Sequence, residues 1–115
     1  MSTLADMPFD RNRKAATPLA AGEIARLQAE LPHWQLRDVA QVPQLYRCYT
    51  FHNFAEALAF TNGVGTLAEQ ENHHPQLTTS WGQVEVAWWT HSVKGLHLND
   101  FIMAARCDVL YSTDA

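Results

Sequence analysis

The sequence predicts an α+β domain in which a four-stranded antiparallel sheet has helices packed on one face. Three observations indicate this fold. Apolar residues repeat at helical spacing in three separate segments, two pairs of β-prone stretches lie between those segments, and each pair can form a hairpin. The predicted order is therefore α-β-β-α-β-β-α. Paired strands between helices are typical of an antiparallel sheet in an α+β fold.

The first helix is predicted to follow Pro18. Ile24, Leu27 and Leu31 fall at positions i, i+3 and i+7, so they share one helix face. Pro32 ends this segment because proline cannot continue a helix.

The first hairpin is predicted from two β-prone stretches, residues 34–39 and 45–51. The second stretch alternates side chains in the way that a strand with two different faces requires. Pro43 lies between the two stretches, and we interpret it as the marker of their connection.

A long helix is predicted next, from Asn53 to about Glu71. Asn53 can cap its first turn, and Glu56 stands in the capping-box position three residues later. Gly63 and Gly65 are poor helix formers, so they either allow close packing on the sheet or mark a break. The predicted apolar stripe of this helix consists of Phe54, Leu58, Thr61, Val64 and Ala68.

The second hairpin is predicted to turn at Gly82-Gln83, because glycine at the first central position suits a type II′ turn. Counting outward from this turn places Trp81 opposite Val84 and His74 opposite His91. Directly opposed residues have Cβ atoms about 4.5–5.5 Å apart, so a third histidine would join the first two. The face predicted to meet the helices consists of Leu77, Trp81, Val84, Val86 and Trp88.

The last helix is predicted over residues 98–110, with Ile102, Ala105 and Val109 as its buried stripe. Residues 1–16 show no apolar period, and we expect a flexible leader there. Residues 17–115 then form a single domain, which suits the length of the chain.

The composition limits the possible partners and the compartment. The net charge is −4 and no basic stripe is present, which argues against a nucleic acid or a membrane surface as the main partner. No apolar run is long enough to span a bilayer, and the N-terminus lacks the apolar middle of a signal peptide. We therefore expect a cytoplasmic protein. Cys48 and Cys107 are interpreted as small buried residues rather than as a disulfide.

The stretch ENHHPQ contains the adjacent histidines His73 and His74, followed by Pro75. Three readings remain open for these histidines together with His91. Three imidazoles could bind zinc, although neighbouring residues in an extended chain point to opposite faces. Imidazole can also give or take a proton near neutral pH. Finally, the three residues could simply be surface histidines at a strand end.

One multi-part motif resembles the signature of pterin-4a-carbinolamine dehydratases. The motif consists of Glu69-x-x-x-His73-His74-Pro75, followed by Trp81, His91 and Asp100. The flanking stretches LPHWQL, YTFHNFAEALAF and LAEQENHHP also look like family sequence. The resemblance covers residues from about 19 to 110, and the α+β fold of the family agrees with the predicted order of elements.

The resemblance implies an enzymatic reaction, carried out by a lyase (a hydro-lyase). A 4a-hydroxytetrahydropterin loses water and becomes a quinonoid dihydropterin, a step in tetrahydrobiopterin recycling. An acid must protonate the departing C4a hydroxyl group, and a base must then accept the N5 proton. The resemblance implies no cofactor and no metal.

The resemblance also implies roles for individual residues. His73 and His91 are the expected acid–base residues. His74 is expected to hold the pterin ring and to assist in catalysis, with Pro75 and Asp100 as further substrate-binding positions.

Three assignments stay open. Trp34 is a further substrate-binding candidate, but it can equally belong to the core or to the wall of a pocket. Asp100 lies in the first turn of the last helix, so it can either stabilise the helix dipole or orient a histidine. The sequence also departs from the family pattern at Asn99 and at His97, and His97 is interpreted as either a weak cap or a surface residue.

The family resemblance further implies a homodimer or a dimer of dimers. Members of the family also serve as dimerisation cofactors for a transcription factor. A protein-binding module that keeps the fold without dehydrating a pterin is therefore the alternative to an enzyme.

Overall fold

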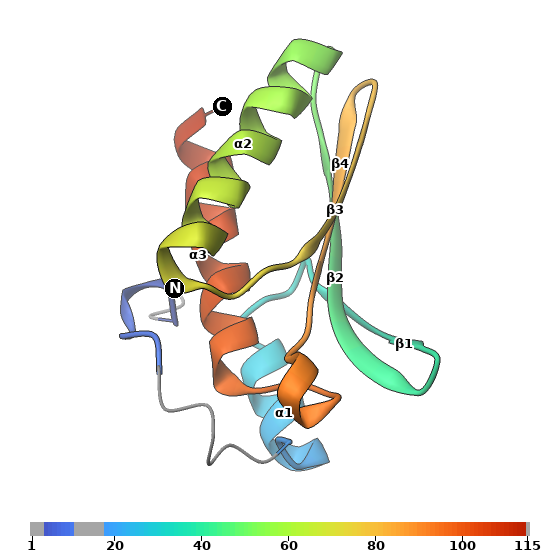
Figure 1. Cartoon of the computed structure of the whole chain (residues 1–115), viewed down its shortest axis with the longest axis vertical. Coiled ribbons are helices and arrows are strands. Elements are labelled where there is room, and N and C mark those ends of the chain that lie inside the picture. The colour runs from blue at the N-terminus through green and yellow to red at the C-terminus, as the bar shows by residue number, and fades with distance from the viewer. Residues whose placement is uncertain (1–3, 11–17, 115) are drawn as a thin grey trace.

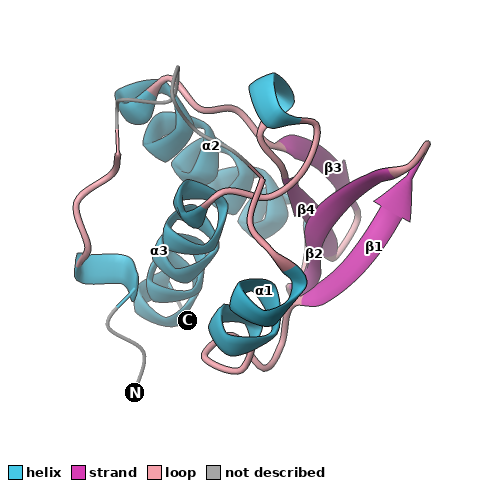
Figure 2. Cartoon of the chain, turned by 90° about the horizontal axis from the view of Figure 1, so that it is seen from below, coloured by secondary structure: helices cyan, strands magenta, loops and turns pink. Residues whose placement is uncertain are grey.

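The structure is a computed structural model that describes residues 4–10 and 18–114, and its order of elements is the predicted one. Helices α2 (Phe54–Glu71) and α3 (Leu98–Asp114) cover one face of the sheet (Figure 1). Helix α1 (Ala21–Gln28) lies on the same side, near α3 (Figure 2). The predicted α+β class and the placement of helices on one face are confirmed.

The sheet contains four antiparallel strands in the spatial order β1-β2-β4-β3. Strands β2 and β4 occupy the centre, whereas β1 and β3 form the two edges. The bounds of the four strands are Gln35–Val39 for β1, Val42–Thr50 for β2, Gln76–Ser80 for β3 and Gln83–Trp88 for β4.

The turn of the first hairpin lies at Ala40 and Gln41 rather than at Pro43. Both turn residues have positive φ angles, 51° and 68°, as a type I′ turn requires. Pro43 is inside β2 and pairs with Asp38 of β1. It is tolerated there because the pairing of β2 with β4 begins only at Leu45, so its missing N–H removes no bond to β4.

The turn of the second hairpin is also displaced from its predicted position. Ser80 pairs with Gln83, which makes Trp81-Gly82 the turn, and only Gly82 has a positive φ, of 75°. Glycine therefore takes the second central position, as in a type II turn, and not the first. His74 is consequently not opposite His91, and Trp81 is 74% exposed instead of facing the helices.

Helix α2 begins as predicted. The Asn53 side chain accepts a hydrogen bond from the Glu56 N–H at 2.8 Å. The predicted stripe is correct from Val64 onward but wrong in the first two turns, where Phe54 and Leu58 are 46% and 43% exposed. The buried stripe consists of Ala57, Phe60, Val64 and Ala68.

In α3, Ile102 and Ala105 are buried as predicted, whereas Val109 is 51% exposed.

The two glycines of α2 do not break the helix, and they lie in different surroundings. A Cβ atom on Gly63 would lie 2.8 Å from Cδ2 of Leu110, so this glycine allows α3 to approach α2 closely. A Cβ atom on Gly65 would meet no heavy atom within 4 Å. The helix–helix contact, which the sequence did not reveal, therefore explains only Gly63.

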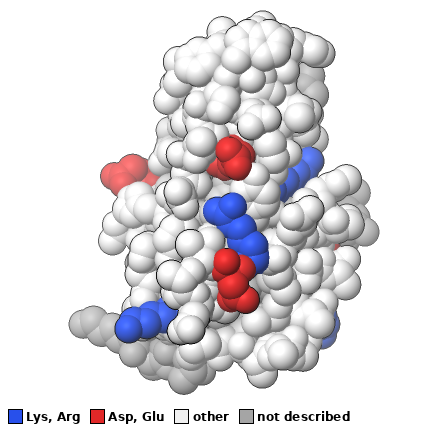
Figure 3. Space-filling model, turned by 90° about the vertical axis from the view of Figure 1, so that its right-hand side faces the viewer, with Lys and Arg blue, Asp and Glu red and all other residues white. Residues whose placement is uncertain are grey.

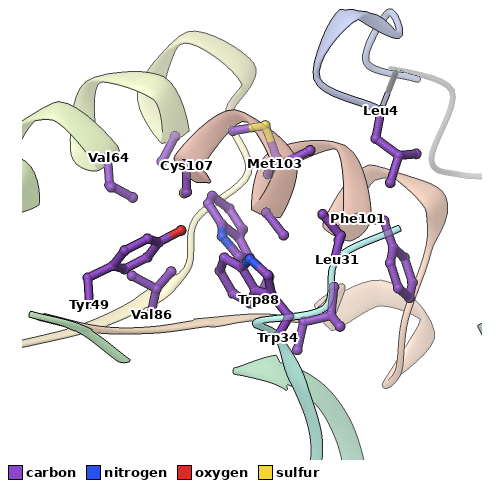
Figure 4. Close-up of a cluster of buried hydrophobic side chains, with 14 of the residues drawn as sticks. Leu4, Leu31, Trp34, Tyr49, Val64, Val86, Trp88, Phe101, Met103 and Cys107 are labelled. Carbon is purple, nitrogen blue, oxygen red and sulfur yellow. The ribbon is translucent and has the colours of Figure 1, made fainter. Parts of the chain in front are cut away.

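A carboxylate of α3 connects core residues of β2 with Trp34, which directly precedes β1. Asp108 of α3 accepts hydrogen bonds from the Trp34 indole N–H at 3.0 Å, from Arg47 Nη1 at 2.6 Å and from the Tyr49 hydroxyl at 2.5 Å. Burial, with the nearby Cys107 and Asp108, raises the pKa of Tyr49 far above its ordinary value, so the phenol stays a donor. Trp34 and Tyr49 belong to the buried cluster around Trp88 (Figure 4).

The cysteines divide between core and surface. Both are free thiols, as predicted, but only Cys107 is buried, and Cys48 is exposed. Burial raises the pKa of Cys107 to about 12.

The face of the sheet away from the helices carries no continuous basic surface among the described residues. Acidic and basic side chains are interspersed over this side of the molecule, and in its middle a basic group lies against an acidic one (Figure 3). None of the helices in the described residues combines the length and apolarity needed to cross a bilayer.

Part of the predicted flexible leader is packed against the domain. Residues 4–10, which we call the N-terminal strap, contain the short helix η1 (Leu4–Asp6) and contact α3. Leu4 and Phe9 are only 2% and 9% exposed. These residues bury apolar side chains in a segment for which the sequence predicted a flexible leader. The rest of the predicted leader, residues 1–3 and 11–16, lies outside the described residues.

Candidate active site

The end of α2 directs His73 into the protein. Asn72 adopts the left-handed conformation, with a φ of 51°, and its N–H bonds to the Glu69 carbonyl. The N–H of His73 bonds back to the Ala68 carbonyl at 3.1 Å, which completes a Schellman motif. His73 is only 4% exposed as a result, whereas Asn72 is exposed.

A fully buried carboxylate holds His73. Oδ1 of Asp100 lies 2.7 Å from Nε2 of the histidine. Oδ2 of the same carboxylate accepts hydrogen bonds from the Thr90 hydroxyl at 2.7 Å and from the His97 N–H at 2.9 Å. Asp100 is 0% exposed, so three protein donors replace its hydration.

The same contacts cap α3. The His97 ring accepts the Asn99 N–H on Nδ1 at 3.0 Å, while Asp100 reaches back to the His97 N–H. This is the reciprocal pattern of a capping box, with an imidazole in place of the usual hydroxyl group. Asp100 therefore both caps the helix and contacts a histidine, the two roles between which the sequence could not decide.

Aromatic rings surround the His73 imidazole. The Trp88 ring is stacked on it, with 5.5 Å between centroids and an interplanar angle of 16°. The Phe9 ring lies 5.6 Å away at 55°. The His73–Asp100 pair is thus enclosed by apolar groups on the side of the core and on the side of the strap.

The other two histidines of the motif are exposed. His74 Nε2 lies 2.5 Å from Glu69 Oε1, and both side chains face solvent, at 53% and 78% exposure. His91 lies in the short helix η3 (His91–Val93), and its ring is 4.9 Å from the Trp89 ring.

The framework around Asp100 connects His91 to His73. Thr90 directly precedes His91, and its hydroxyl binds the carboxylate that contacts His73. The Thr90 N–H also donates to the Gly95 carbonyl at 2.8 Å, which closes the loop that carries His91. One carboxylate therefore contacts His73 directly and also binds the residue that precedes His91.

The remaining predicted site residues lie in different environments. Pro75 is half-buried and immediately precedes β3. Trp34 is 2% exposed in the core and hydrogen-bonded to Asp108, so little of its surface is open to a ligand. Among the described residues, no group of three or more His, Cys, Asp or Glu side chains is placed to hold a metal ion.

Sequence reasoning missed several residues that build the site. Thr90 and Phe9 carry no pattern that singles them out. The cap at His97 was among the sequence interpretations, but its reciprocal bond with Asp100 was not predicted, because histidine is not a usual capping residue. Asn72 could have been recognised, because asparagine is the common substitute for glycine at a left-handed helix end.

Comparisons with known proteins agree on one family. The family model described as "Pterin 4 alpha carbinolamine dehydratase" matches residues 17–110. A protein of Microcystis aeruginosa is 50% identical over 111 residues, which cover 96% of each chain. A protein of Chlorobium limicola is 57% identical over 98 residues, covering 85% of this chain and 87% of that protein. Both are named "Putative pterin-4-alpha-carbinolamine dehydratase".

Two solved structures are similar to this chain. A "transcriptional coactivator/pterin dehydratase" of Brucella melitensis has a TM-score of 0.75 and 26% identity, covering 83% of this chain and 99% of that one. A pterin dehydratase-like protein, described as a RuBisCO assembly factor in the α-carboxysome, has a TM-score of 0.58 and 23% identity. That match covers 68% of this chain and 88% of the other, and it supports the fold alone.

Proposed function

The chain belongs to the pterin 4 alpha carbinolamine dehydratase family, and from this premise we propose that it dehydrates a 4a-hydroxytetrahydropterin to the quinonoid dihydropterin. In the cell this reaction serves tetrahydrobiopterin recycling. The observation that carries the proposal is the buried His73–Asp100 pair, with 2.7 Å between Nε2 and Oδ1. The same carboxylate also binds Thr90, the residue that precedes His91. A buried imidazole–carboxylate pair is costly to desolvate, so its presence favours a chemical role.

The proposed reaction needs one proton donor and one proton acceptor. The donor protonates the C4a hydroxyl group, the C4a–O bond breaks, and the N5 lone pair forms the new double bond as water leaves. The N5 proton then passes to the base. His73 and His91 are the proposed acid–base residues, and imidazole is suited to both roles near neutral pH.

Asp100 prepares His73 for this chemistry. When its carboxylate accepts the proton on Nε2, Nδ1 is the nitrogen that can accept a further proton. His74, 53% exposed and paired with Glu69, is proposed to hold the pterin ring, with Pro75 beside it.

The decisive experiment is a stopped-flow assay with synthetic 4a-hydroxytetrahydropterin. We expect His91→Ala to lower kcat by about 10²–10⁴-fold, the usual contribution of a general acid or base. His91 is the best position to test because it is exposed, so its replacement should leave stability nearly unchanged. His52→Ala is the matched control. His52 is also exposed, and it lies just before the first turn of α2, at the opposite end of this helix from His73.

Two negative results have different meanings. Wild-type protein that dehydrates the pterin no faster than buffer would refute the proposed function. Full activity in His91→Ala, with an active wild type, would refute only the role of His91. His73→Ala should also lose activity, but this side chain is buried, so its stability must be measured beside its rate.

A second candidate function is assembly with other chains, including a homodimer or a dimer of dimers. Phe54 and Leu58 are half-exposed on one side of α2, and β3 is an edge strand of the sheet. Exposed apolar side chains and open strand edges are typical of protein-binding surfaces. The Brucella structure, a coactivator by its title, supports a binding role beside a catalytic one.

Assembly through α2 has its own test. We expect the wild type to sediment as an oligomer, and Leu58→Glu to shift it toward the monomer because a charge there is desolvated in an interface. Leu36→Glu is the matched control, since Leu36 is an equally exposed leucine, at 43%, on β1. An unchanged sedimentation coefficient in Leu58→Glu would exclude this face of α2 as the interface.

A further inference from the structure

The N-terminal strap reaches the candidate active site through one side chain. The Phe9 ring lies 5.6 Å from the His73 ring, and Phe9 is 9% exposed. His73 also stacks on Trp88 of the sheet. A segment separated from His73 by more than sixty residues thus supplies part of its apolar surroundings.

Arg106 of α3 fastens the strap to the end of α2. Its guanidinium group donates to the Met7 carbonyl at 2.9 Å and to the Ala5 carbonyl at 3.3 Å. Its Nη1 atom also donates to Glu71 at 2.7 Å, and the side chains of this ion pair are only 20% and 14% exposed. Because Glu71 precedes His73 by two residues, one guanidinium group holds both the strap and the turn that carries the histidine.

A second set of hydrogen bonds to the strap comes from Asn99, the residue before Asp100. The Asn99 side chain is fully buried and bonds to both backbone groups of Asp10. It accepts the Asp10 N–H at 2.9 Å and donates to the Asp10 carbonyl at 2.7 Å. The strap is therefore held on both sides of Phe9 by side chains that neighbour the His73–Asp100 pair in sequence or in space.

We propose that the N-terminal strap is a positioning element of the active site and that Phe9 is its positioning residue. The inference rests on the proposed dehydratase function. Phe9 limits rotation of the His73 imidazole and keeps water from the His73–Asp100 hydrogen bond. A hydrogen bond shielded from water is stronger, and a catalytic group loses efficiency when the side chains around it no longer hold its geometry.

The test compares four variants for stability, kcat and KM. We expect Phe9→Ala to lower kcat by about 10- to 100-fold, as loss of a group supporting a catalytic residue does, with little change in KM. Phe9→Leu restores apolar cover and should recover most of kcat. Arg106→Lys loses the forked contact with two carbonyls and should lower kcat in the same direction. Leu31→Ala is the control: Leu31 is 2% exposed in the core, so this variant loses stability but keeps kcat.

An NMR measurement keeps the inference testable apart from activity. The Phe9 ring current shifts the imidazole resonances of His73, and a long-range ¹H–¹⁵N correlation spectrum should show these resonances moving in Phe9→Ala but not in Leu31→Ala. If the His73 resonances did not move in Phe9→Ala, the inference would be overturned, whether or not the wild type is active. An inactive wild type by itself would refute only the proposed function. A kcat in Phe9→Ala that matches or exceeds the wild-type value would also overturn it.

Discussion

Asp100→Ala is expected to lower the free energy of unfolding by about 3–5 kcal/mol, because three buried groups lose their acceptor at about 1–3 kcal/mol each. The carboxylate accepts from the Thr90 hydroxyl and the His97 N–H and contacts His73 Nε2, and all three groups are buried. Alanine offers none of them an acceptor, and each unsatisfied donor adds a desolvation penalty. Because His73 loses its partner in the same step, pterin dehydration should be lost as well.

Urea denaturation followed by circular dichroism measures this loss. Glu23→Ala is the matched control, because Glu23 lies in the first turn of α1 but is exposed and pairs only with Arg26 in the contacts described. A carboxylate that acts only on a helix dipole should cost far less to remove than Asp100. Equal losses in the two variants would show that the hydrogen bonds of Asp100 contribute nothing beyond the dipole.

Asp108→Ala should have the second largest effect, a loss of about 2–4 kcal/mol, because a partly buried charge and two buried donors lose their acceptor. Arg47 is only 15% exposed and would keep its charge without the ion pair that it makes with Asp108 at 2.6 Å. The Trp34 indole N–H and the Tyr49 hydroxyl would also lose their acceptor.

A double-mutant cycle separates the charge from the other donors. Arg47→Met keeps aliphatic bulk but removes the guanidinium group, whose Cζ lies 4.2 Å from the centroid of the Tyr49 ring. We expect Arg47→Met to cost stability in the wild type and to cost less, or to stabilise, in the Asp108→Ala background. Strictly additive effects in urea denaturation would mean that the Arg47–Asp108 ion pair contributes nothing to the fold.

Local signals were enough to predict the order of elements. The cap at Asn53 and the end of α2 near Glu71 depend on residues within a few positions of each other, and both were correct. The predicted turn of the second hairpin was wrong because Gly82 can occupy either central position of a two-residue turn. The choice depends on a distant contact, the hydrogen bond from the Phe51 N–H to the Gly82 carbonyl at 2.8 Å.

In the second hairpin, the predicted pairing of β3 with β4 was displaced by two residues from the observed pairing. A displacement of two residues leaves the prediction of the fold correct. Side chains alternate with a period of two, so Leu77 and Val86 stayed on the helix-facing side. The pairing of His74 with His91 did not survive, because it required an exact register. A prediction about faces is therefore more robust than a prediction about opposed residues.

The family resemblance named the residues of the candidate site, but the sequence did not predict the contacts between them. The family resemblance pointed to His73 and Asp100, which lie 27 positions apart and meet through tertiary packing. The strap was missed because its apolar residues follow no helix or strand period. Its partners, Asn99 and Arg106, are about as far from it in sequence as the chain allows.

This separation has a consequence for the order in which the protein can assemble. The bonds from Asp10 to Asn99 and from Ala5 to Arg106 span 89 and 101 positions. Contacts that close such long loops cost the most chain entropy and contribute little until other elements are in place. During synthesis, the strap leaves the ribosome before its docking site, which is incomplete until residue 106 has been added. We therefore expect the strap to enclose His73 late in folding, after α3 has packed in its native position.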